Sequence, residues 1–302
     1  MKTPIFTGAC VAIVTPYSEN GINFDKLGEL IEMQIAGGTD AIVICGTTGE
    51  ASTQTMDEHK AAIEYCMKKA DHRCKVIAGT GSNCTATALE LSLYAESCGV
   101  DGLLIVTPYY NKATQTGLIK HYTYIADRVH TPIILYNVPG RTGTKFTAET
   151  YYELSKHPMI NGIKEASGDF KLVTHTRKLC GDNMNIWSGN DDQVVPLMSL
   201  GAKGVISVVS NIKPELMVEM THLALEGKFE EASKLQIECI DLCDALFCEV
   251  NPIPVKVALN MMGKDIGILR MPLCDMSDAH KELLSRALLN AGLEVKNPKA
   301  GA

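Results

Sequence analysis

The sequence predicts a closed (β/α)8 barrel followed by a C-terminal helical subdomain, and three observations lead to this prediction. Eight short apolar segments alternate with longer amphipathic segments along the chain. The short segments are continuously apolar, which is typical of parallel strands covered on both faces. The alternation ends near residue 226, close to the ~250 residues that such barrels usually need. A doubly wound sheet rarely has eight evenly spaced units, so we favour the barrel.

The strand candidates are short runs rich in valine, isoleucine and leucine. They cover residues 10–14, 41–44, 75–78, 102–106, 132–136, 160–164, 185–188 and 204–208. Helical periodicity follows many of them, over residues 25–36, 56–69, 85–98, 116–129 and 170–179. These segments predict the outer ring of a barrel formed by residues 1–226.

The pattern becomes helical from Phe229 onward. Helix candidates cover residues 229–249, 254–262 and 277–293. We therefore assign residues 227–302 to a C-terminal helical subdomain and expect residues 296–302 to be loosely held.

Composition excludes several classes of function. The chain has 302 residues, of which 46% are hydrophobic, which is enough for a large core. Its 28 basic and 35 acidic residues give a net charge of -7 without a basic stripe, so nucleic acid is not an expected partner. We find neither an apolar run long enough to cross a bilayer nor a signal peptide at the start, and we expect no membrane association and a cytoplasmic location.

The cysteines and histidines do not predict a metal site. There are 11 cysteines without any Cys-x-x-Cys pair, as expected of reduced thiols. Cys239, Cys243 and Cys248 form the only cluster, and no histidine lies nearby to complete four ligands. We expect these thiols to pack between helices. The histidines also lack the spacing of a zinc-dependent aldolase or hydrolase.

Lys164 is the residue most suggestive of chemistry. It ends an apolar strand candidate just before a turn, in the run from Asn161 to Gly168. An apolar pocket raises the neutral, nucleophilic fraction of a lysine amine, so this position suits a lysine that forms a Schiff base. A solvated lysine paired with Glu165 is the ordinary alternative. Neighbouring side chains point to opposite faces of a strand, however, which argues against that pairing.

Other polar residues follow neighbouring strand candidates at the same end of the predicted barrel. They are Thr47 and Thr48 after the second strand, Tyr109 and Tyr110 after the fourth, and Tyr136 at the end of the fifth. Taken singly, the threonines also fit a turn or a helix cap, and the tyrosines fit a core. Barrel active sites lie at the carboxyl ends of the strands, so their convergence with Lys164 favours an active site.

Two glycine-rich stretches do not indicate a nucleotide site. Residues 79–84 begin like a dinucleotide-binding loop but lack the third glycine and the acidic residue that should follow. Residues 201–204 resemble a phosphate loop but precede the last strand, at the opposite end of the barrel from the site. We interpret them as a turn between a helix and a strand.

Three motifs, at residues 46–50, 136–142 and 162–168, together resemble the dihydrodipicolinate synthase and N-acetylneuraminate lyase superfamily. The resemblance extends from Thr7 through the C-terminal helices. The run Pro139-Gly140-Arg141-Thr142 resembles the synthase branch more than the sialate lyases. The resemblance implies a barrel enzyme that uses pyruvate and L-aspartate 4-semialdehyde in lysine biosynthesis through diaminopimelate.

The resemblance also implies roles for individual residues. Lys164 forms an imine with pyruvate, without any cofactor or metal, and the derived enamine adds to the aldehyde. Tyr136 exchanges protons, and Thr47 and Tyr110 extend a hydroxyl relay to solvent. In the superfamily the tyrosine matching Tyr110 enters the site of a neighbouring subunit, and most members are dimers of dimers. We therefore expect a homo-oligomer.

The remaining implied positions bind substrate. Thr47 and Thr48 hold the carboxylate of pyruvate, and Arg141 binds the carboxylate of the aldehyde. Gly189 and Ile206 match positions whose backbone carbonyls line the pocket.

The chain departs from the superfamily at the site where lysine inhibits many members. His59, Asn83 and Tyr109 match that site, whereas Ala51, Met56 and Thr87 replace the serine, histidine and glutamate of lysine-inhibited members. Thr87 supplies no carboxylate for a cationic amine, which would leave that charge poorly compensated. We expect weak or absent inhibition by lysine.

Two alternatives remain at this stage. A sibling aldolase that cleaves a sugar acid or another 2-keto acid would use the same imine, although Arg141 argues against it. A non-catalytic barrel that binds keto acids would need no lysine, tyrosine and hydroxyl relay together.

Overall fold

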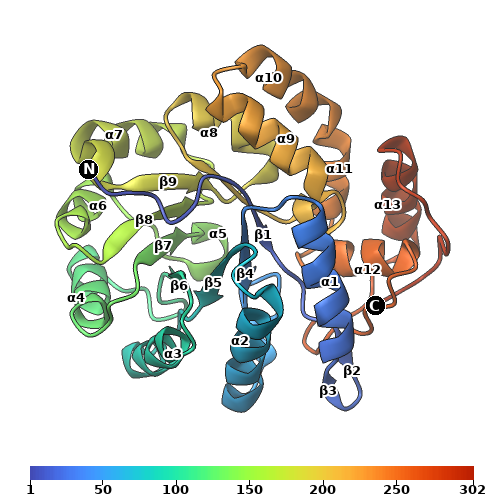
Figure 1. Cartoon of the computed structure of the whole chain (residues 1–302), viewed down its shortest axis with the longest axis horizontal. Helices are drawn as coiled ribbons and strands as arrows, with labels where there is room; N and C mark the ends of the chain where they lie inside the picture. Colours follow the sequence, from blue (N-terminus) through green and yellow to red (C-terminus); the bar gives the residue numbers. More distant parts are fainter.

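Eight parallel strands close into a barrel in the computed structural model, which describes residues 1–302 (Figure 1). The order around the barrel is β1-β10-β9-β8-β7-β6-β5-β4, with β4 returning to β1. The strands are β1 (Gly8–Ala12), β4 (Ala41–Ile44), β5 (Lys75–Gly79), β6 (Gly102–Val106), β7 (Ile133–Asn137), β8 (Ile160–Glu165), β9 (Asn185–Ser188) and β10 (Gly204–Ser207). The predicted fold class is confirmed, and each predicted strand overlaps an observed one.

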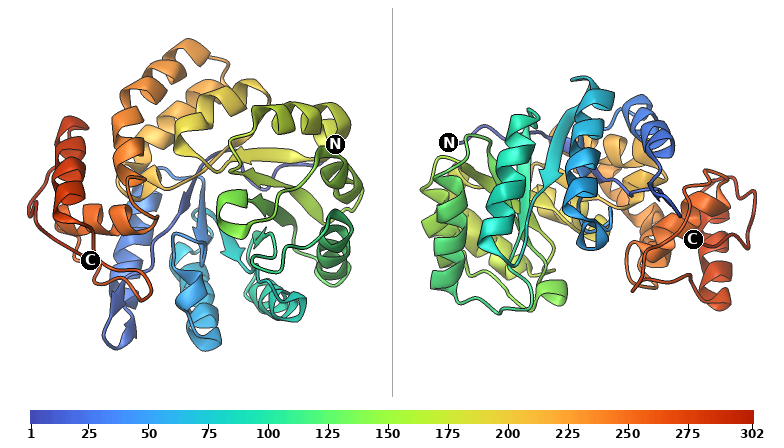
Figure 2. Two further views of the ribbon diagram at one scale, coloured as in Figure 1. Left: turned by 180° about the vertical axis from the view of Figure 1, so that it is seen from behind. Right: turned by 90° about the horizontal axis from the view of Figure 1, so that it is seen from below.

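Helices surround the barrel, as both views in Figure 2 show. They are α1 (Phe24–Ala36), α2 (Met56–Ala70), α3 (Thr85–Ser97), α4 (Gln115–Ala126), α6 (Ala148–Ser155), α7 (Phe170–Cys180), α8 (Val194–Ser199) and α9 (Pro214–Leu225). Several begin at side-chain caps: Thr55 and Glu58 form a reciprocal capping box at α2, and Asp169 caps α7. The sequence did not predict α6, α8 or α9, nor the small hairpin of β2 (Tyr17–Ser18) and β3 (Gly21–Ile22).

The barrel interior is filled by side chains from alternate strand positions. In β7, Ile134 and Tyr136 belong to the interior cluster, while Ile133 and Leu135 pack in the layer between strands and helices. Phe6 stacks on Trp187 within the interior cluster, with the ring centroids 5.0 Å apart. The interior is therefore a packed core, and a substrate site has room only at its rim.

Four helices form the C-terminal part: α10 (Phe229–Glu238), α11 (Ile240–Leu246), α12 (Ile253–Met261) and α13 (Asp278–Asn290). The prediction of one helix over residues 229–249 is wrong, because the chain breaks at Cys239, which joins α10 to α11. The prediction of a loose tail is also wrong, because Lys296 and Asn297 donate backbone hydrogen bonds to the carbonyl of Met261.

The predicted packing of the clustered cysteines between helices agrees with the structure for Cys239 and Cys243, whereas Cys248 is only half-buried and lies after α11. Cys239 and Cys243 are buried, with their sulfurs 3.9 Å apart. No group of three or more histidine, cysteine, aspartate or glutamate side chains is arranged to hold a metal ion.

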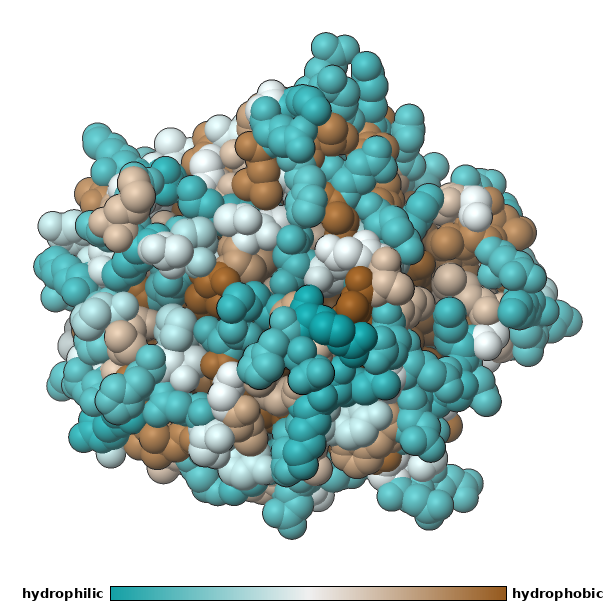
Figure 3. All heavy atoms as spheres, viewed as in Figure 1, coloured by the Kyte–Doolittle hydropathy of each residue, from teal (hydrophilic) through white to brown (hydrophobic).

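The outer surface is mixed in polarity. Hydrophilic residues cover most of the face seen in Figure 3, and hydrophobic residues lie between them in small groups. No helix combines the length and the apolar character that crossing a membrane would need.

A buried ion pair joins the C-terminal part to the barrel. The Nζ of Lys256, in α12, lies 2.7 Å from Oε1 of Glu50, which follows β4, and both side chains are buried. The same ammonium donates to the carbonyls of Thr15 and Ile268, and the other oxygen of Glu50 accepts from the backbone N–H of Arg270. Burial lowers the pKa of Lys256, and Glu50 opposes that effect.

We predict that K256M destabilises the protein strongly, because it leaves the Glu50 carboxylate buried without a counter-charge. Loss of one partner of a buried pair costs about 3–5 kcal/mol. Urea-induced unfolding measures this loss. E50Q/K256M should lose less than K256M alone, and K234M, on an exposed ion pair, should unfold like the wild type. Unchanged stability of K256M would contradict the prediction.

The ion pair between Arg270 and Glu58 predicts a loss of stability in acid. The Arg270 guanidinium lowers the pKa of Glu58 from its ordinary value of 4.5 to about 2. The contribution of Glu58 is therefore complete above about pH 4.5 and is lost as the pH falls towards 2. We expect E58Q, which retains the capping box, to unfold at neutral pH more easily than the wild type, with the difference shrinking as the pH falls through this range. A difference independent of pH would contradict this prediction.

Candidate active site

Lys164 and Tyr136 face each other at the rim of the barrel. The register of β7 and β8 pairs Tyr136 with Lys164. Lys164 Nζ lies 4.4 Å from the centroid of the Tyr136 ring, and the two residues are only 5% and 7% exposed. The phenol of Tyr136 and the amine of Lys164 thus lie together in a buried position. Both could exchange protons there with a bound substrate.

Lys164 and Lys256 are the only two buried lysines, and their environments differ. Lys256 is held by Glu50 and by two backbone carbonyls. Lys164 lies over an aromatic ring and forms no ion pair with a carboxylate. The amine of Lys164 is therefore available for reaction, whereas that of Lys256 serves the structure.

Glu165 points to the outer face of the barrel, as the alternation of side chains predicted. Its carboxylate accepts hydrogen bonds from Asn137 Nδ2, the Tyr151 hydroxyl and the backbone N–H of Ser167, at 2.8–3.1 Å. Burial raises the pKa of Glu165, and these donors oppose the rise. Because Asn137 and Glu165 are also register partners, the cluster fixes β7 and β8 directly behind the pair of Tyr136 and Lys164.

The loop after β4 carries the two threonines. Backbone hydrogen bonds from Gly49 and Ala51 to the carbonyl of Gly46 close it into a tight turn. Thr47 is half-buried, and Thr48 is buried. Helix α2 is capped by Thr55, so the alternative role of the two threonines as a helix cap is excluded. A side chain at Gly79 would meet the Cys45 carbonyl at 2.2 Å, so glycine there allows β5 to pack against this loop.

Tyr109 and Tyr110 point in different directions although they are adjacent. Tyr109 lines a cavity, whereas Tyr110 is 90% exposed. The backbone of Tyr110 is in the left-handed region, with φ of 72°, and its N–H donates to the carbonyl of Thr142. The structure therefore does not bring Tyr110 together with Tyr136 and Thr47 within one chain.

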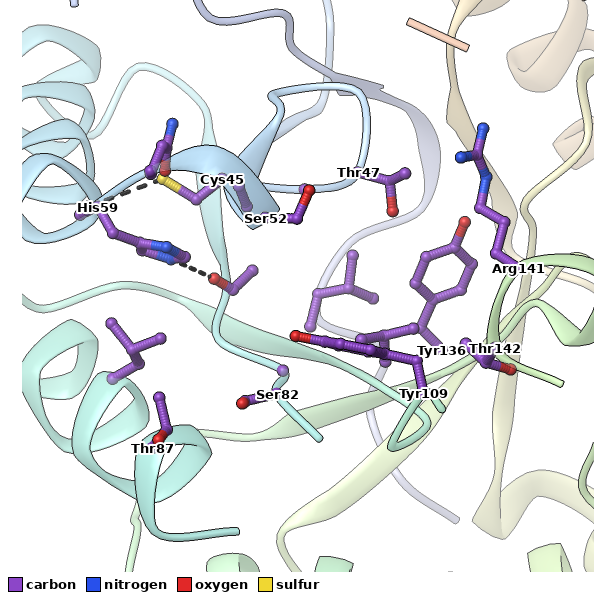
Figure 4. Close-up of a pocket in the computed structure, with 18 of the residues that line it drawn as sticks. Cys45, Thr47, Ser52, His59, Ser82, Thr87, Tyr109, Tyr136, Arg141 and Thr142 are labelled. Carbon is purple, nitrogen blue, oxygen red and sulfur yellow. Dashed lines mark hydrogen bonds between the residues drawn. The ribbon is translucent and has the colours of Figure 1, made fainter. Parts of the chain in front are cut away.

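Arg141 lies in the short helix α5 (Pro139–Thr142), which follows β7. Its Nη2 donates to the backbone carbonyl of Asn251 at 2.8 Å. The side chain is exposed at the mouth of the site, near the hydroxyl of Tyr136 in Figure 4. A guanidinium in this position suits the carboxylate of an incoming substrate.

One cavity of about 420 Å³ is lined by Thr47, Tyr136 and Arg141, whereas Lys164 and Thr48 do not line it (Figure 4). Thr47, Tyr136, Arg141 and Thr142 lie together at one end, and Tyr109 lies between them and the region of His59 and Thr87. Five of the six residues considered for lysine binding line it: Ala51, Met56, His59, Thr87 and Tyr109. Asn83 does not line it. None of the lining residues is aspartate or glutamate, so the cavity offers no carboxylate to a cationic amine.

His59 is a neutral polar group in this region. Its Nε2 donates to the carbonyl of Gly79 at 2.7 Å, and burial lowers the pKa of its ring.

Gly189 directly follows β9 and lies beside Lys164, whereas Ile206 belongs to β10, two strands away from β8. A side chain at Gly189 would approach Cε of Lys164 to 3.1 Å and Ala166 to 2.8 Å, so glycine leaves room around the amine. Ile206 is fully buried in the interior cluster. The glycine-rich turn at residues 201–204 lies at the opposite end, since Gly204 pairs with Gly8 at the start of β1.

Sequence reasoning missed two groups at this site. The hydroxyl of Thr107 donates to that of Thr142 beneath Arg141, at 3.0 Å. Asn251, from the C-terminal part, contacts both Thr48 and Arg141. The position of Thr107 directly after β6 is only a weak indication of a site residue. Nothing in the sequence around Asn251 indicates that it contributes to a site at the rim of the barrel.

Comparison with known proteins places these features in one family. A sequence model of the Dihydrodipicolinate synthetase family matches residues 5–291. The chain is 55% identical to 4-hydroxy-tetrahydrodipicolinate synthase of Thermoanaerobacter sp. (strain X514), over 96% of this chain and 98% of that protein. It is 52% identical to the protein of the same name from Acetivibrio thermocellus, over 97% and 100% of the two chains. The crystal structure of dihydrodipicolinate synthase from Aquifex aeolicus superposes with a TM-score of 0.95 at 42% identity, covering 97% of this chain and 100% of that one.

Proposed function

This chain belongs to the dihydrodipicolinate synthetase family, and we propose that it joins pyruvate to L-aspartate 4-semialdehyde through an imine on Lys164. Its reaction is that of 4-hydroxy-tetrahydrodipicolinate synthase, a lyase of lysine biosynthesis through diaminopimelate. The observation that carries the proposed mechanism is the buried pair of Lys164 and Tyr136, 4.4 Å apart from amine to ring centroid.

The first chemical step forms the imine. The neutral amine of Lys164 attacks the keto carbon of pyruvate, and the keto oxygen leaves as water after taking up protons. The hydroxyl of Tyr136 donates its proton to the departing oxygen. The cationic imine then withdraws electrons from the methyl group, which loses a proton and becomes the carbon of an enamine.

The second step forms the carbon–carbon bond. The enamine carbon attacks the aldehyde carbon of the second substrate, and the aldehyde oxygen takes up a proton as the imine is regenerated. Tyr136, which gave its proton to the departing keto oxygen, takes up the proton that the methyl group loses and passes it to the aldehyde oxygen. The amino group of the second substrate then attacks the imine carbon and displaces the amine of Lys164, which frees the product. The amine, the acid and the proton relay all belong to the protein, and we propose that no cofactor or metal is required.

Fixed polar groups hold the two carboxylates. Thr47 and Thr48 bind that of pyruvate, and Arg141 binds that of the aldehyde with its two-pronged guanidinium. The backbone carbonyls of Gly189 and Ile206 line the proposed position of pyruvate beside Lys164. Thr47, Tyr136 and Arg141 line a cavity of about 420 Å³, which is large enough for small substrates to approach these groups.

We propose that the working form is a homo-oligomer in the cytoplasm. Thr47 and Tyr136 lie at the cavity, whereas Tyr110 projects from the surface in a left-handed backbone conformation. A partner subunit that receives Tyr110 would complete the hydroxyl relay of its own site. The dimer of dimers expected from the family resemblance meets this requirement.

We expect borohydride to trap pyruvate on Lys164. Reduction of the imine adds a stable mass to the peptide that contains Lys164, and peptide mass spectrometry locates it. K164A, and wild-type protein without pyruvate, provide controls that should show no adduct. Pyruvate binding without an adduct would contradict the aldolase mechanism and favour a keto-acid-binding barrel. Steady-state rates with a panel of aldehydes separate the synthase from a sibling aldolase.

We also expect the activity to resist inhibition by lysine. The cavity beside Thr87 and Met56 offers a lysine ligand no carboxylate for its cationic amine. Initial rates measured against increasing lysine concentration test this expectation. Half-inhibition by sub-millimolar lysine would contradict it.

A further inference from the structure

We propose that Asn251, which belongs to the C-terminal part, is a positioning residue that aims the hydroxyl of Thr48 at the carboxylate of pyruvate. This inference rests on the proposed function and adds to it a group from outside the barrel. Asn251 Nδ2 donates to Thr48 Oγ1 at 3.0 Å, across 203 positions of the chain. Both residues are buried, with 6% and 2% exposure.

The direction of this hydrogen bond gives it a chemical consequence. A threonine hydroxyl has one proton and two lone pairs, and the amide of Asn251 occupies a lone pair. The proton of Thr48 is then directed elsewhere, as a donor. A carboxylate accepts hydrogen bonds but donates none, so a hydroxyl fixed as a donor is the form that binds pyruvate.

Asn251 also contacts the other anion-binding group. Its backbone carbonyl accepts from Nη2 of Arg141 at 2.8 Å. The groups proposed to bind the carboxylates of pyruvate and of the aldehyde are therefore both positioned by one residue. Farther along the same segment, the ion pair of Lys256 and Glu50 holds it against the loop that carries Thr48.

The side chain of Asn251 is poorly placed for a purely structural role. Its Oδ1 is buried and has no hydrogen-bond partner. An unsatisfied buried oxygen costs stability, so an asparagine selected for packing alone would be expected to pair both ends of its amide. The pairing of Nδ2 with Thr48 accounts for this residue better than stability does.

The test is the kinetics of N251A. The variant loses the amide but retains the backbone carbonyl that holds Arg141. We expect the KM for pyruvate to rise about tenfold, as when a hydrogen bond to a charged group is lost. The kcat and the KM for the aldehyde should stay within about twofold of wild type.

N260A is the matched control. Asn260 lies in α12, and its side chain forms hydrogen bonds with Ile266, Gly267 and Gly301, so the KM of this variant for pyruvate should not change.

Two further variants separate positioning from general disturbance. In the T48V background, N251A should raise the KM for pyruvate by less than about twofold, because the hydroxyl through which it acts is gone. N251D cannot donate when ionised, and its KM for pyruvate should rise at least as much as that of N251A. A wild-type KM for pyruvate in N251A or N251D, or additive effects of T48V and N251A, would overturn the inference. Absence of a borohydride-trapped adduct in the wild type would instead overturn the proposed function itself.

Discussion

The register between β7 and β8 is the constraint on which the site depends. It places Tyr136 opposite Lys164 inside the barrel and Asn137 opposite Glu165 outside it. A slip of one residue would exchange these faces, burying a carboxylate in the interior and removing the amine from the pocket. The hydrogen bonds that Glu165 accepts from Asn137, Tyr151 and Ser167 oppose such a slip, so a polar cluster on the outer face fixes the reactive pair on the inner one.

Much of the fold could be predicted because its determinants are local. Continuous apolar runs mark strands that are covered on both faces, and caps such as Thr55 and Asp169 mark where helices begin. Two of the missed helices, α8 and α9, lack such signals, although α6 has a cap at Thr147. Helix α8 has only six residues, and α9 begins at a proline without a side-chain cap. The break at Cys239 and the docking of the tail on Met261 depend on tertiary contacts, which a periodic pattern does not contain.

The same division applies to the candidate site. Lys164, Tyr136 and Thr47 were predicted because each lies at or just after the carboxyl end of a strand, and these ends converge at one rim of a parallel barrel. Asn251 and Lys256 were not predicted, because Asn251 lies in the turn before α12 and Lys256 in α12 itself, 110 and 206 positions away from their partners Arg141 and Glu50. Thr107 is adjacent to a strand, yet its pairing with Thr142 becomes evident only when α5 folds over it. Sequence reasoning thus found candidate residues at the strand ends and missed residues that form hydrogen bonds with them from elsewhere in the chain.

The two buried lysines show why burial alone does not define a reactive amine. The ammonium of Lys256 forms an ion pair with Glu50 and hydrogen bonds to backbone carbonyls, which hold it in one geometry. The ammonium position of Lys164 lies over the ring of Tyr136 at the rim of the barrel, and no carboxylate forms an ion pair with it. The ion pair of Lys256 also supports the part of the barrel that carries the candidate site. By holding Glu50, Lys256 ties α12 to the loop of Thr47 and Thr48, so the position of these two candidate residues depends on the C-terminal helices as well as on the barrel strands.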